Sequence, residues 1–393
     1  MSLSNAQWAH EGSCVWMGGA VRPELCLVRG QGSRLWDAQG REYLDFVGGW
    51  AVCALGHSPE VVAKALFEQA STLLHCSPGY WNPVAIELAQ KLSQLSGFER
   101  VFLGTTGAEA NECAIKLARK HGVSRGAWKI VTAFDGFHGR TLATMSATGK
   151  PAWKDLFGPK VPGFVHVPPN DIAALESAMT SEVCALMLEP VQGEGGVVPF
   201  TVEYLQAARK LCDRTGALLV FDEVQTGMGR CGSWFAFQNL GIRPDVLTLG
   251  KGLGAGYPLS ACLTDAKFDR FEPGDQGGTF TYHPLGAAVG LAVIGEMERL
   301  DLVAQAQRKG LLLRGVLEEL SGRFGLRNLR GSGLLQAFDL PQPHGQKLVA
   351  RAREAGLLLN SPRPSSIRLM PPLVVAEAEI EEFRQKLEVA LAS

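Results

Sequence analysis

ALLVFDEVQTGMGRCGSWFAFQNLGIRPDVLTLGKGLGAG, residues 217–256, contains two short apolar runs, and each run stops at a chargeable side chain. The first run ends at Asp222 and the second ends at Lys251. Short apolar runs bounded by Gly, Asp and Pro predict buried strands of a parallel sheet. Ligands of open α/β sheets bind outside the carboxyl ends of the strands, so we expect Asp222 and Lys251 to share one ligand.

A carbonyl cofactor such as pyridoxal phosphate uses both kinds of side chain. Its aldehyde forms a Schiff base with a lysine amine, and an acidic partner keeps its pyridine nitrogen protonated. The alternative is that Lys251 is a surface lysine and Asp222 caps a helix. Glycines at every second position of residues 250–256 favour a ligand site, because such a permissive backbone allows close approach to a ligand.

Composition narrows the class of protein. The chain has 393 residues, of which 46% are hydrophobic and 20% charged, which is typical of a globular enzyme of two domains. Its net charge of −1 provides no basic field for nucleic acid or an acidic membrane. The nine cysteines lack the C-x-x-C spacing of zinc and redox sites, so we expect free thiols and no metal. With no signal-like start and no long apolar run, we expect a cytoplasmic protein.

The rest of the chain predicts alternating strands and helices. Residues 1–30 are expected to form an irregular arm, residues 32–57 a hairpin with a DAQG turn, and helices are expected near 59–73 and 82–96. The loop GTTG, residues 104–107, separates a short apolar strand from a helix. Small-residue loops at this position offer free backbone N–H groups to a phosphate, although many strand–helix turns share the composition. A single helix is expected from about residue 284 to 320.

A further polar cluster follows the predicted strand at residues 129–133. In FDGFHGR, residues 134–140, an aromatic face at Phe137 suits a flat heterocycle, and the guanidinium of Arg140 suits a carboxylate. Core packing for Phe137 and a surface position for Arg140 are the alternatives. We interpret His138, between them, as a pocket wall.

FDEVQTGMGR (221–230) followed by LTLGKGLGAGYPL (247–259) resembles the core of the class III pyridoxal-phosphate aminotransferases of the acetylornithine and ornithine type. The resemblance extends from about residue 27 to 375. It implies an α/β fold of the fold-type-I pyridoxal-phosphate transferases, with a mainly parallel, seven-stranded sheet and an α+β small domain. We expect an N-terminal arm and part of the small domain in 1–57, the large cofactor-binding domain in 58–285, and the C-terminal small domain in 286–393.

The resemblance also implies roles for individual residues. Lys251 and Asp222 are expected to be catalytic, and Thr279 to reach the phosphate of a neighbouring subunit. Glu194 is expected to act as a gate that pairs with Arg368 for donors lacking a second carboxylate. The cofactor-binding set is Thr106, Gly107, Ala108, Phe137, Asp222, Val224, Gln225, Lys251 and Thr279. The substrate-binding set is Trp50, Arg140, Glu194 and Arg368, with Trp50 as core packing the alternative.

The implied reaction moves the amino group of an ω-amine or amino acid of the N-acetylornithine or ornithine type to 2-oxoglutarate, in a homodimer with shared active sites. The chain departs from the family pattern at Thr105, where asparagine is usual, and at residues 281–283, in a loop that the resemblance implies helps to line the partner's pocket. The donor therefore stays open between these amines and 4-aminobutyrate, putrescine, lysine or a related amine. A same-fold aminomutase is another alternative. A nicotinamide dehydrogenase is excluded because no G-x-G-x-x-G unit follows an early strand.

Overall fold

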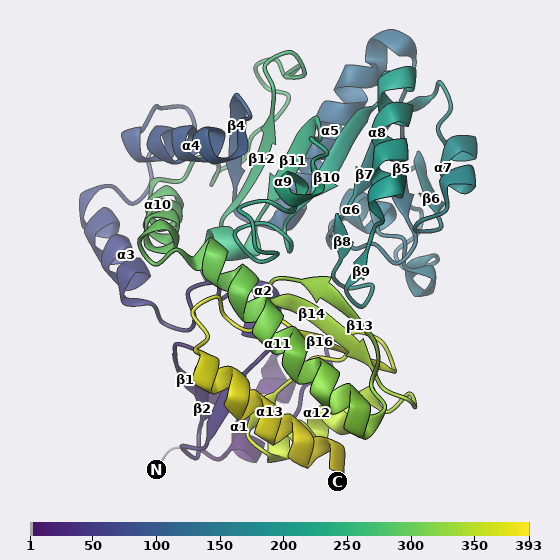
Figure 1. Ribbon diagram of the computed structural model, residues 1–393. Helices are drawn as coiled ribbons and strands as arrows, with labels where there is room; N and C mark the ends of the chain where they lie inside the picture. Colours follow the sequence, from purple (N-terminus) through teal and green to yellow (C-terminus); the bar gives the residue numbers. More distant parts are fainter. Residues whose placement is uncertain (1–2, 393) are drawn as a thin grey trace.

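A seven-stranded sheet forms the centre of the upper body in Figure 1, a computed structural model that describes residues 3–392. All neighbouring strands run parallel except β12, which is antiparallel to both β4 and β11. The mainly parallel sheet expected from the short apolar runs is therefore confirmed. From edge to edge the strands are β4 (Arg100–Gly104), β12 (Ser260–Thr264), β11 (Val246–Leu249), β10 (Leu218–Asp222), β7 (Val183–Leu188), β5 (Lys129–Ala133) and β6 (Phe164–Val167).

Both faces of this sheet are covered, because alternate residues of each strand point to opposite sides. Leu218 and Val220 of β10 pack in one apolar cluster with helix α5 (Gly107–Gly122). Leu219 and Phe221 pack in the other cluster with helix α8 (Val202–Thr215). The remaining elements around the sheet are α6 (Leu142–Ala147), α7 (Ile172–Ala178), α9 (Ala236–Leu240), β8 (Val191–Gln192), β9 (Val198–Pro199), η1 (Val123–Arg125), η2 (Pro151–Trp153) and η3 (Lys251–Leu253).

Three helices flank the β4 edge of the sheet: α3 (Glu60–Thr72), α4 (Pro83–Ser96) and α10 (Pro284–Arg299). The first two were expected from the sequence within a residue or two. α4 has the signals that make such an expectation possible, with Asn82 as N-cap, Pro83 in the first turn and Gly97 in the left-handed conformation at the end. α10 packs on α3 and α4, so it extends the upper body.

The lower body contains strands from both ends of the chain. The hairpin expected at residues 32–57 is present as antiparallel β2 and β3, and β3 also pairs in parallel with β15 near the C-terminus. One sheet holds β1 (Leu27–Gln31), β2 (Arg34–Asp37), β3 (Glu42–Asp45) and β15 (Leu357–Leu358). The other holds β13 (Arg327–Ser332), β14 (Leu335–Asp339) and β16 (Ser366–Leu369), and the helices are α11 (Leu302–Phe324), α12 (Gly345–Glu354) and α13 (Glu377–Ala392).

Two expectations about these elements were wrong. The single helix expected from about residue 284 to 320 is two helices, because Asp301 adopts the left-handed conformation with φ 50° between α10 and α11. The arm expected to be irregular contains helix α1 (Asn5–Val15), which Ser4 and Gln7 close with a capping box. Residues 1–2 of that arm, and residue 393 of the expected C-terminal domain, lie outside the described residues. The division at residues 57 and 285 stays a prediction.

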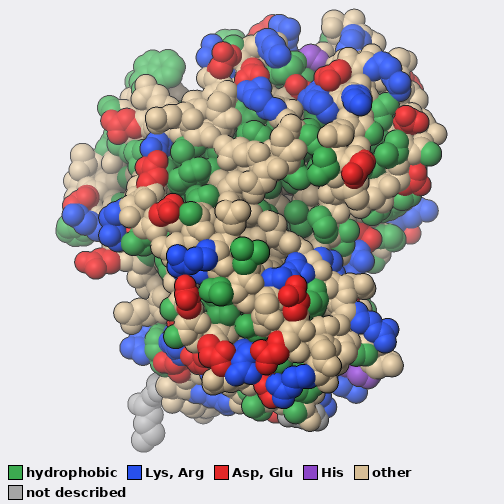
Figure 2. Space-filling view, in the orientation of Figure 1, with side chains coloured by type: hydrophobic (Ala, Val, Ile, Leu, Met, Phe, Trp, Pro, Cys, Tyr) green, Lys and Arg blue, Asp and Glu red, His purple; other side chains and the backbone are tan. Residues whose placement is uncertain are grey.

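Charged side chains of both signs are interspersed over the face shown in Figure 2, in agreement with the net charge of −1. Among the helices of residues 3–392, none combines the length and the apolar character needed to cross a bilayer.

A partly buried ion pair joins β3 to the segment that follows it. His57 Nε2 lies 2.7 Å from Asp45 Oδ2, and the backbone of His57 pairs with Gly32 in both directions. Burial opposes a charge on His57, but hydrogen bonds with Asp45 and Cys53 outweigh it and raise the pKa of the ring from 6.5 to about 9. The protonated imidazole therefore stabilises the fold.

We expect this contribution to depend on pH in a defined window. Because the folded-state pKa is raised, the stabilisation is fully present below about pH 6.5 and is lost as the pH rises through about 9. The substitution His57→Gln should cost about 2 kcal/mol in the free energy of unfolding at pH 6, and the difference from wild type should shrink toward pH 9.5. Urea unfolding at several pH values measures this. A difference that stays constant across the window contradicts the assignment.

Candidate active site

Five segments of the upper body meet at the carboxyl edge of the central sheet. Asp222 is the last residue of β10, and Lys251 comes two residues after β11. Helix α5 begins after β4, while Phe137 and Glu189 follow β5 and β7. The sheet therefore brings together the strand-end residues on which the sequence analysis concentrated, as expected for an open α/β sheet.

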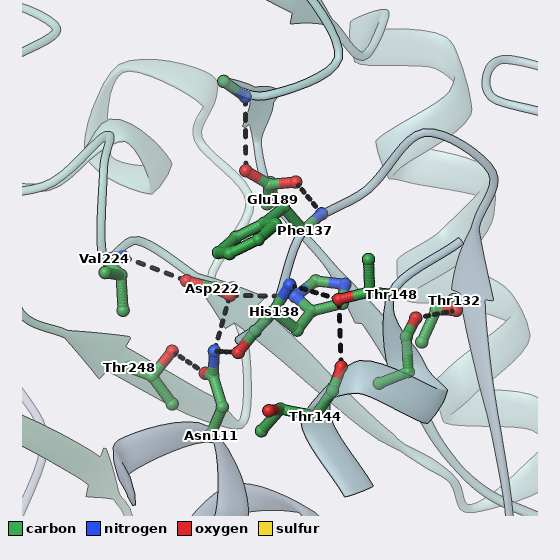
Figure 3. A network of polar contacts seen from close by, with 12 residues as sticks. Asn111, Thr132, Phe137, His138, Thr144, Thr148, Glu189, Asp222, Val224 and Thr248 are labelled. Carbon is green, nitrogen blue, oxygen red and sulfur yellow. Dashed lines mark hydrogen bonds and ion pairs between the residues drawn. The ribbon is translucent and has the colours of Figure 1, made fainter. Parts of the chain in front are cut away.

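The Asp222 carboxylate is the centre of a buried network, which Figure 3 shows from close by. Its Oδ2 accepts hydrogen bonds from Asn111 Nδ2 at 2.7 Å and from His138 Nδ1 at 2.8 Å, and its Oδ1 accepts from the N–H of Val224 at 3.1 Å. Asn111 is fixed in turn, because its Oδ1 accepts from Thr248 Oγ1 at 2.7 Å. With two donors on Oδ2 and one on Oδ1, the lone pair that is left lies on Oδ1.

Two further titratable groups surround this carboxylate. Burial opposes a charge on His138, but the hydrogen bond and the charge of Asp222 raise the pKa of its imidazole. His138 was interpreted as a pocket wall, and the structure instead gives it a direct bond to Asp222. Burial, together with the charge of Asp222, raises the pKa of Glu189. Glu189 accepts from the N–H groups of Phe137 at 2.8 Å and Gly193 at 3.2 Å, so it holds the backbone on both sides of the site.

Lys251 is held in a strained backbone conformation, with φ 42°. Among residues 3–392, no side chain or carbonyl accepts a hydrogen bond from its ammonium group. Burial and then the charge of Arg368 lower the pKa of Lys251, although Asp222 and Glu194 act in the opposite direction. The result is an amine that is available for chemistry rather than tied into an ion pair.

The start of α5 offers two free backbone donors. Thr106 is the N-cap, and its capping box with Glu109 satisfies the N–H groups of both residues. The N–H groups of Gly107 and Ala108 have no acceptor within residues 3–392 and stand at the positive end of the helix. A Cβ on Gly107 would lie 2.7 Å from Val224 Cγ1, so glycine is needed for the helix to approach this closely. This helix end can hold a phosphate group.

The proposed gate pair lies beside Lys251. Arg368 Nη2 and Glu194 Oε1 are 2.7 Å apart, although the two residues come from distant parts of the chain. Arg368 is buried, with Nε and Nη2 donating to Asn360 Oδ1 at 3.0 and 2.8 Å and Nη1 donating to Gln225 Oε1 at 3.2 Å. Burial opposes the charge of Glu194, but Arg368 lowers its pKa overall. Gln225, expected at the cofactor, is therefore bonded to the gate arginine.

The other expected substrate residues lie nearer the surface. Arg140 is exposed, and its guanidinium carbon lies 5.0 Å from the ring centroid of Trp153 and 5.9 Å from that of Phe137. Trp50 is 59% exposed on the short turn α2 (Gly48–Ala51), where it has φ 62°. Thr279 is also exposed, and no hydrogen bond within residues 3–392 joins it to the start of α5. These three residues are exposed and lie outside the buried network around Asp222, so their roles in substrate and cofactor binding stay predictions.

The residues present fit pyridoxal phosphate. The unpaired amine of Lys251 matches the aldehyde of the cofactor, and the free lone pair on Asp222 Oδ1 matches its pyridinium N–H. The N–H groups at the start of α5, which have no acceptor within residues 3–392, match its phosphate. Glycines at 107 and 250 leave space that Val224 occupies, and a Cβ on Gly250 would lie 3.3 Å from Val224 Cγ1. The ring of Phe137 supplies a flat apolar surface.

Sequence reasoning missed three residues of the site. Asn111 is the polar member of the buried face of α5, and a polar residue at an apolar helical position was the available signal. Glu189 directly follows β7, so the strand-end argument applied to Asp222 could have found it. Lys150 has no such signal, because only the folded chain brings its Nζ to 3.8 Å from Glu194 Oε2.

Comparisons with known proteins agree with this geometry. The model of the family described as aminotransferase class-III matches residues 18–391. Acetylornithine aminotransferase 2 of Bordetella bronchiseptica is 49% identical over 378 residues, which cover 95% of this chain and 96% of that protein. The solved acetylornithine aminotransferase of Elizabethkingia anophelis is 31% identical with a TM-score of 0.88 and full coverage of both chains. An ornithine aminotransferase structure from Toxoplasma gondii, with partial occupancy of pyridoxal phosphate, is 32% identical with a TM-score of 0.95, covering 99% of this chain and 94% of that one.

The substitution Asp222→Asn tests the central network. An amide in place of the carboxylate removes the negative charge and sets an NH2 group against a neighbouring donor, so we expect turnover to fall roughly a hundredfold to thousandfold while the cofactor still binds. Thr248→Val is the control, because it loosens Asn111 but leaves the charge, and should cost tenfold or less. Turnover and cofactor absorption are measured together. An Asp222→Asn enzyme that binds cofactor and works within about tenfold of wild type contradicts the role.

Proposed function

Because the chain belongs to the class III aminotransferases, we propose that it transfers the terminal amino group of N-acetylornithine or ornithine to 2-oxoglutarate. That it is a pyridoxal-phosphate-dependent transaminase follows from the family itself. The proposed donor is supported by the relatives that share almost half of its residues over nearly the whole chain. The proposed acceptor is supported by one observation, the Glu194–Arg368 ion pair beside Lys251.

Lys251 is the proposed catalytic base. When bound, pyridoxal phosphate supplies a carbonyl that accepts the amino group and a ring that delocalises the electron pair left by the broken C–H bond. The Lys251 amine, with its lowered pKa, is proposed to take the proton from the donor carbon and to return it on the cofactor side. Because Nζ has no hydrogen-bonding partner within residues 3–392, it is free to move between these positions.

Asp222 is proposed to keep the pyridine nitrogen protonated. Its carboxylate is buried and already holds two donors on one oxygen, so the free lone pair on Oδ1 is the one available to the ring. A fixed negative charge in a site that excludes water stabilises the protonated ring more strongly than it does in water. His138 and Asn111 are positioning residues, because they act through the orientation of Asp222.

Arg368 and Glu194 are proposed to distinguish the two substrates. N-acetylornithine and ornithine carry no carboxylate beside the reacting terminal amine and leave the ion pair closed, whereas the carboxylate beside the keto group of 2-oxoglutarate takes the place of Glu194 on Arg368. Asn360 and Gln225 hold the guanidinium in either case. Arg140 is proposed to receive the other substrate carboxylate, and Trp50 to border the pocket.

Assembly and location are part of the proposal. A homodimer with shared active sites would bring Thr279 of one protomer to the phosphate end of α5 in its partner, which accounts for its exposure in the single chain. A cytoplasmic location is supported by the cysteines of residues 3–392, all of which are free thiols.

The first experiment is the visible absorption of the purified enzyme, followed by separate half-reactions with N-acetylornithine, ornithine, 4-aminobutyrate and putrescine. We expect a band of lysine-bound cofactor that N-acetylornithine or ornithine converts fastest. Fastest conversion by 4-aminobutyrate or putrescine replaces the proposed donor with another ω-amine. Product analysis without any oxo acid separates a transaminase from an aminomutase.

The substitution Lys251→Ala should abolish catalysis without abolishing cofactor binding. We expect turnover to fall roughly 10⁴-fold or more, because no other amine of the site has both a free Nζ and this place at the end of β11. Borohydride reduction and mass spectrometry should attach the cofactor to the wild type and not to the variant. Turnover within about tenfold of wild type contradicts the assignment.

The substitution Arg368→Ala should weaken binding of the acceptor more than binding of the donor. We expect the KM for 2-oxoglutarate to rise roughly tenfold to hundredfold, and the KM for N-acetylornithine, which has no carboxylate beside its reacting amine, to rise far less. Because Arg368 is buried, the milder Arg368→Gln and the midpoint of thermal unfolding serve as controls. Equal effects on donor and acceptor contradict the gate.

A further inference from the structure

A cavity of about 510 Å³ lies at the β6 edge of the central sheet, an edge that Figure 1 shows. Its walls come from the residue that follows β5, from α6, from β6 and from the loop between α6 and β6. None of the residues expected to bind the cofactor lines it, although Lys150 and Trp153 of its wall also lie against the ring of Phe137. Small-molecule sites usually have volumes of roughly 300–1,000 Å³. The cavity is therefore large enough for a ligand of its own.

Basic side chains line this cavity, and no acidic side chain within residues 3–392 does. The basic residues include Lys150, Lys154 and Lys160. Lys150 Nζ already lies 3.8 Å from Glu194, but Lys160 Nζ is buried and has no hydrogen-bond partner in the described part of the chain. An ammonium group that is withdrawn from water without an acceptor costs free energy. Because lysine has a flexible four-carbon stem, Lys160 can reach an anion in the cavity, which would supply the missing acceptor.

Aromatic rings form the apolar part of the wall. Phe134, Trp153 and Phe164 all line the cavity. Phe134 is 38% exposed, although it directly follows the buried strand β5. Flat aromatic faces pack favourably against another ring. The cavity therefore combines a surface for an aromatic ring with a positive charge that has no partner.

His166 adds a hydrogen-bond acceptor to the same wall. The hydroxyl of Thr132 donates its only proton to the carbonyl oxygen of Ala147 at 2.8 Å, so it accepts from His166 Nδ1 at 2.7 Å. Burial, and then the charge of His138, lower the pKa of His166, which favours the neutral ring. A neutral imidazole with its proton on Nδ1 has a lone pair on Nε2, and no donor among the described residues reaches that atom. An N–H group of a ligand can therefore donate to it.

We propose that this cavity binds a small aromatic carboxylate with a ring N–H, of the indole type, as a second ligand of the enzyme. The carboxylate pairs with Lys160 and the ring N–H donates to His166 Nε2, while the ring itself packs against the three aromatic side chains. The ligand borders the active site without entering it, because Lys150 and Trp153 adjoin both places. The site is independent of the proposed donor and acceptor, since none of the residues proposed to bind them lines the cavity.

Isothermal titration calorimetry of the holoenzyme with indole-3-acetate tests the site. We expect a dissociation constant below about 1 mM, as is usual for a ligand of this size. Lys160→Met removes the charge that pairs with the carboxylate and should weaken binding roughly tenfold. Lys210→Met removes the same charge from an exposed position on α8 and should change the affinity less than about twofold. Thermal unfolding of each variant shows whether the fold is kept.

Two analogues of the ligand test the other contacts. 3-Methylindole lacks the carboxylate, so it should bind roughly tenfold more weakly and should not respond to Lys160→Met. 1-Methylindole-3-acetate lacks the N–H donor and should bind roughly fivefold more weakly than indole-3-acetate, as expected for one lost hydrogen bond. In the variant His166→Phe, which has no acceptor, the two acids should bind within about twofold of each other.

Arg368→Gln separates this site from the active site. Because Arg368 does not line the cavity, this variant should keep the affinity for indole-3-acetate within about twofold of wild type. A loss of affinity in Arg368→Gln that exceeds the loss in Lys160→Met places the carboxylate in the active site and overturns the proposal. The absence of binding at concentrations up to about 1 mM also overturns it. Equal effects of Lys160→Met and Lys210→Met have the same consequence.

Discussion

The buried carboxylate of Asp222 is the constraint on which the site depends. An ionised group at 3% exposure costs several kcal/mol unless donors surround it, and here Asn111, His138 and the N–H of Val224 supply them. Those donors come from α5, from the loop after β5 and from the turn after β10. Stabilising one charge therefore fixes three segments against each other, including the helix end whose first N–H groups have no acceptor within residues 3–392.

The remaining charges make the site selective for anions. Lys251, Arg368, Arg140 and Lys150 contribute positive groups, while the raised pKa of Glu189 favours its neutral form. Glu194 is paired with Arg368, so its charge is already offset. A ligand with a phosphate and one or two carboxylates complements this balance, whereas a neutral ligand leaves like charges close together. Burial is the largest cause of the lowered pKa values of both Lys251 and Lys150, and the charge of Arg368 adds to the shift in each.

The sequence predicted the parts of this arrangement that follow from local pattern. Apolar runs that stop at Asp222 and Lys251 predict strand ends, and strand ends of a parallel sheet share one edge, so the position of the site followed directly. The break at Asp301 could not be predicted, because the helical pattern continues on both sides and a non-glycine residue adopts a left-handed conformation there. Lys150 was missed because its contact with Glu194 joins loops after different strands, and the Glu194–Arg368 pairing was available only from the family resemblance.

Gln225 shows how the gate and the cofactor residues are connected. It was expected to face the cofactor, yet its Oε1 accepts from Arg368, and a Cβ on Gly193 would lie 1.7 Å from that oxygen. Val224 and Gln225 belong to the short turn that directly follows Asp222, the last residue of β10, so one segment supplies the carboxylate for the ring and orients the gate guanidinium. Gly193, whose N–H bonds to Glu189, precedes Glu194 itself. A shift of the turn after β10 would therefore alter the cofactor end and the substrate end together. Gly193 stands beside the gate glutamate because only glycine leaves room there for the side chain of Gln225.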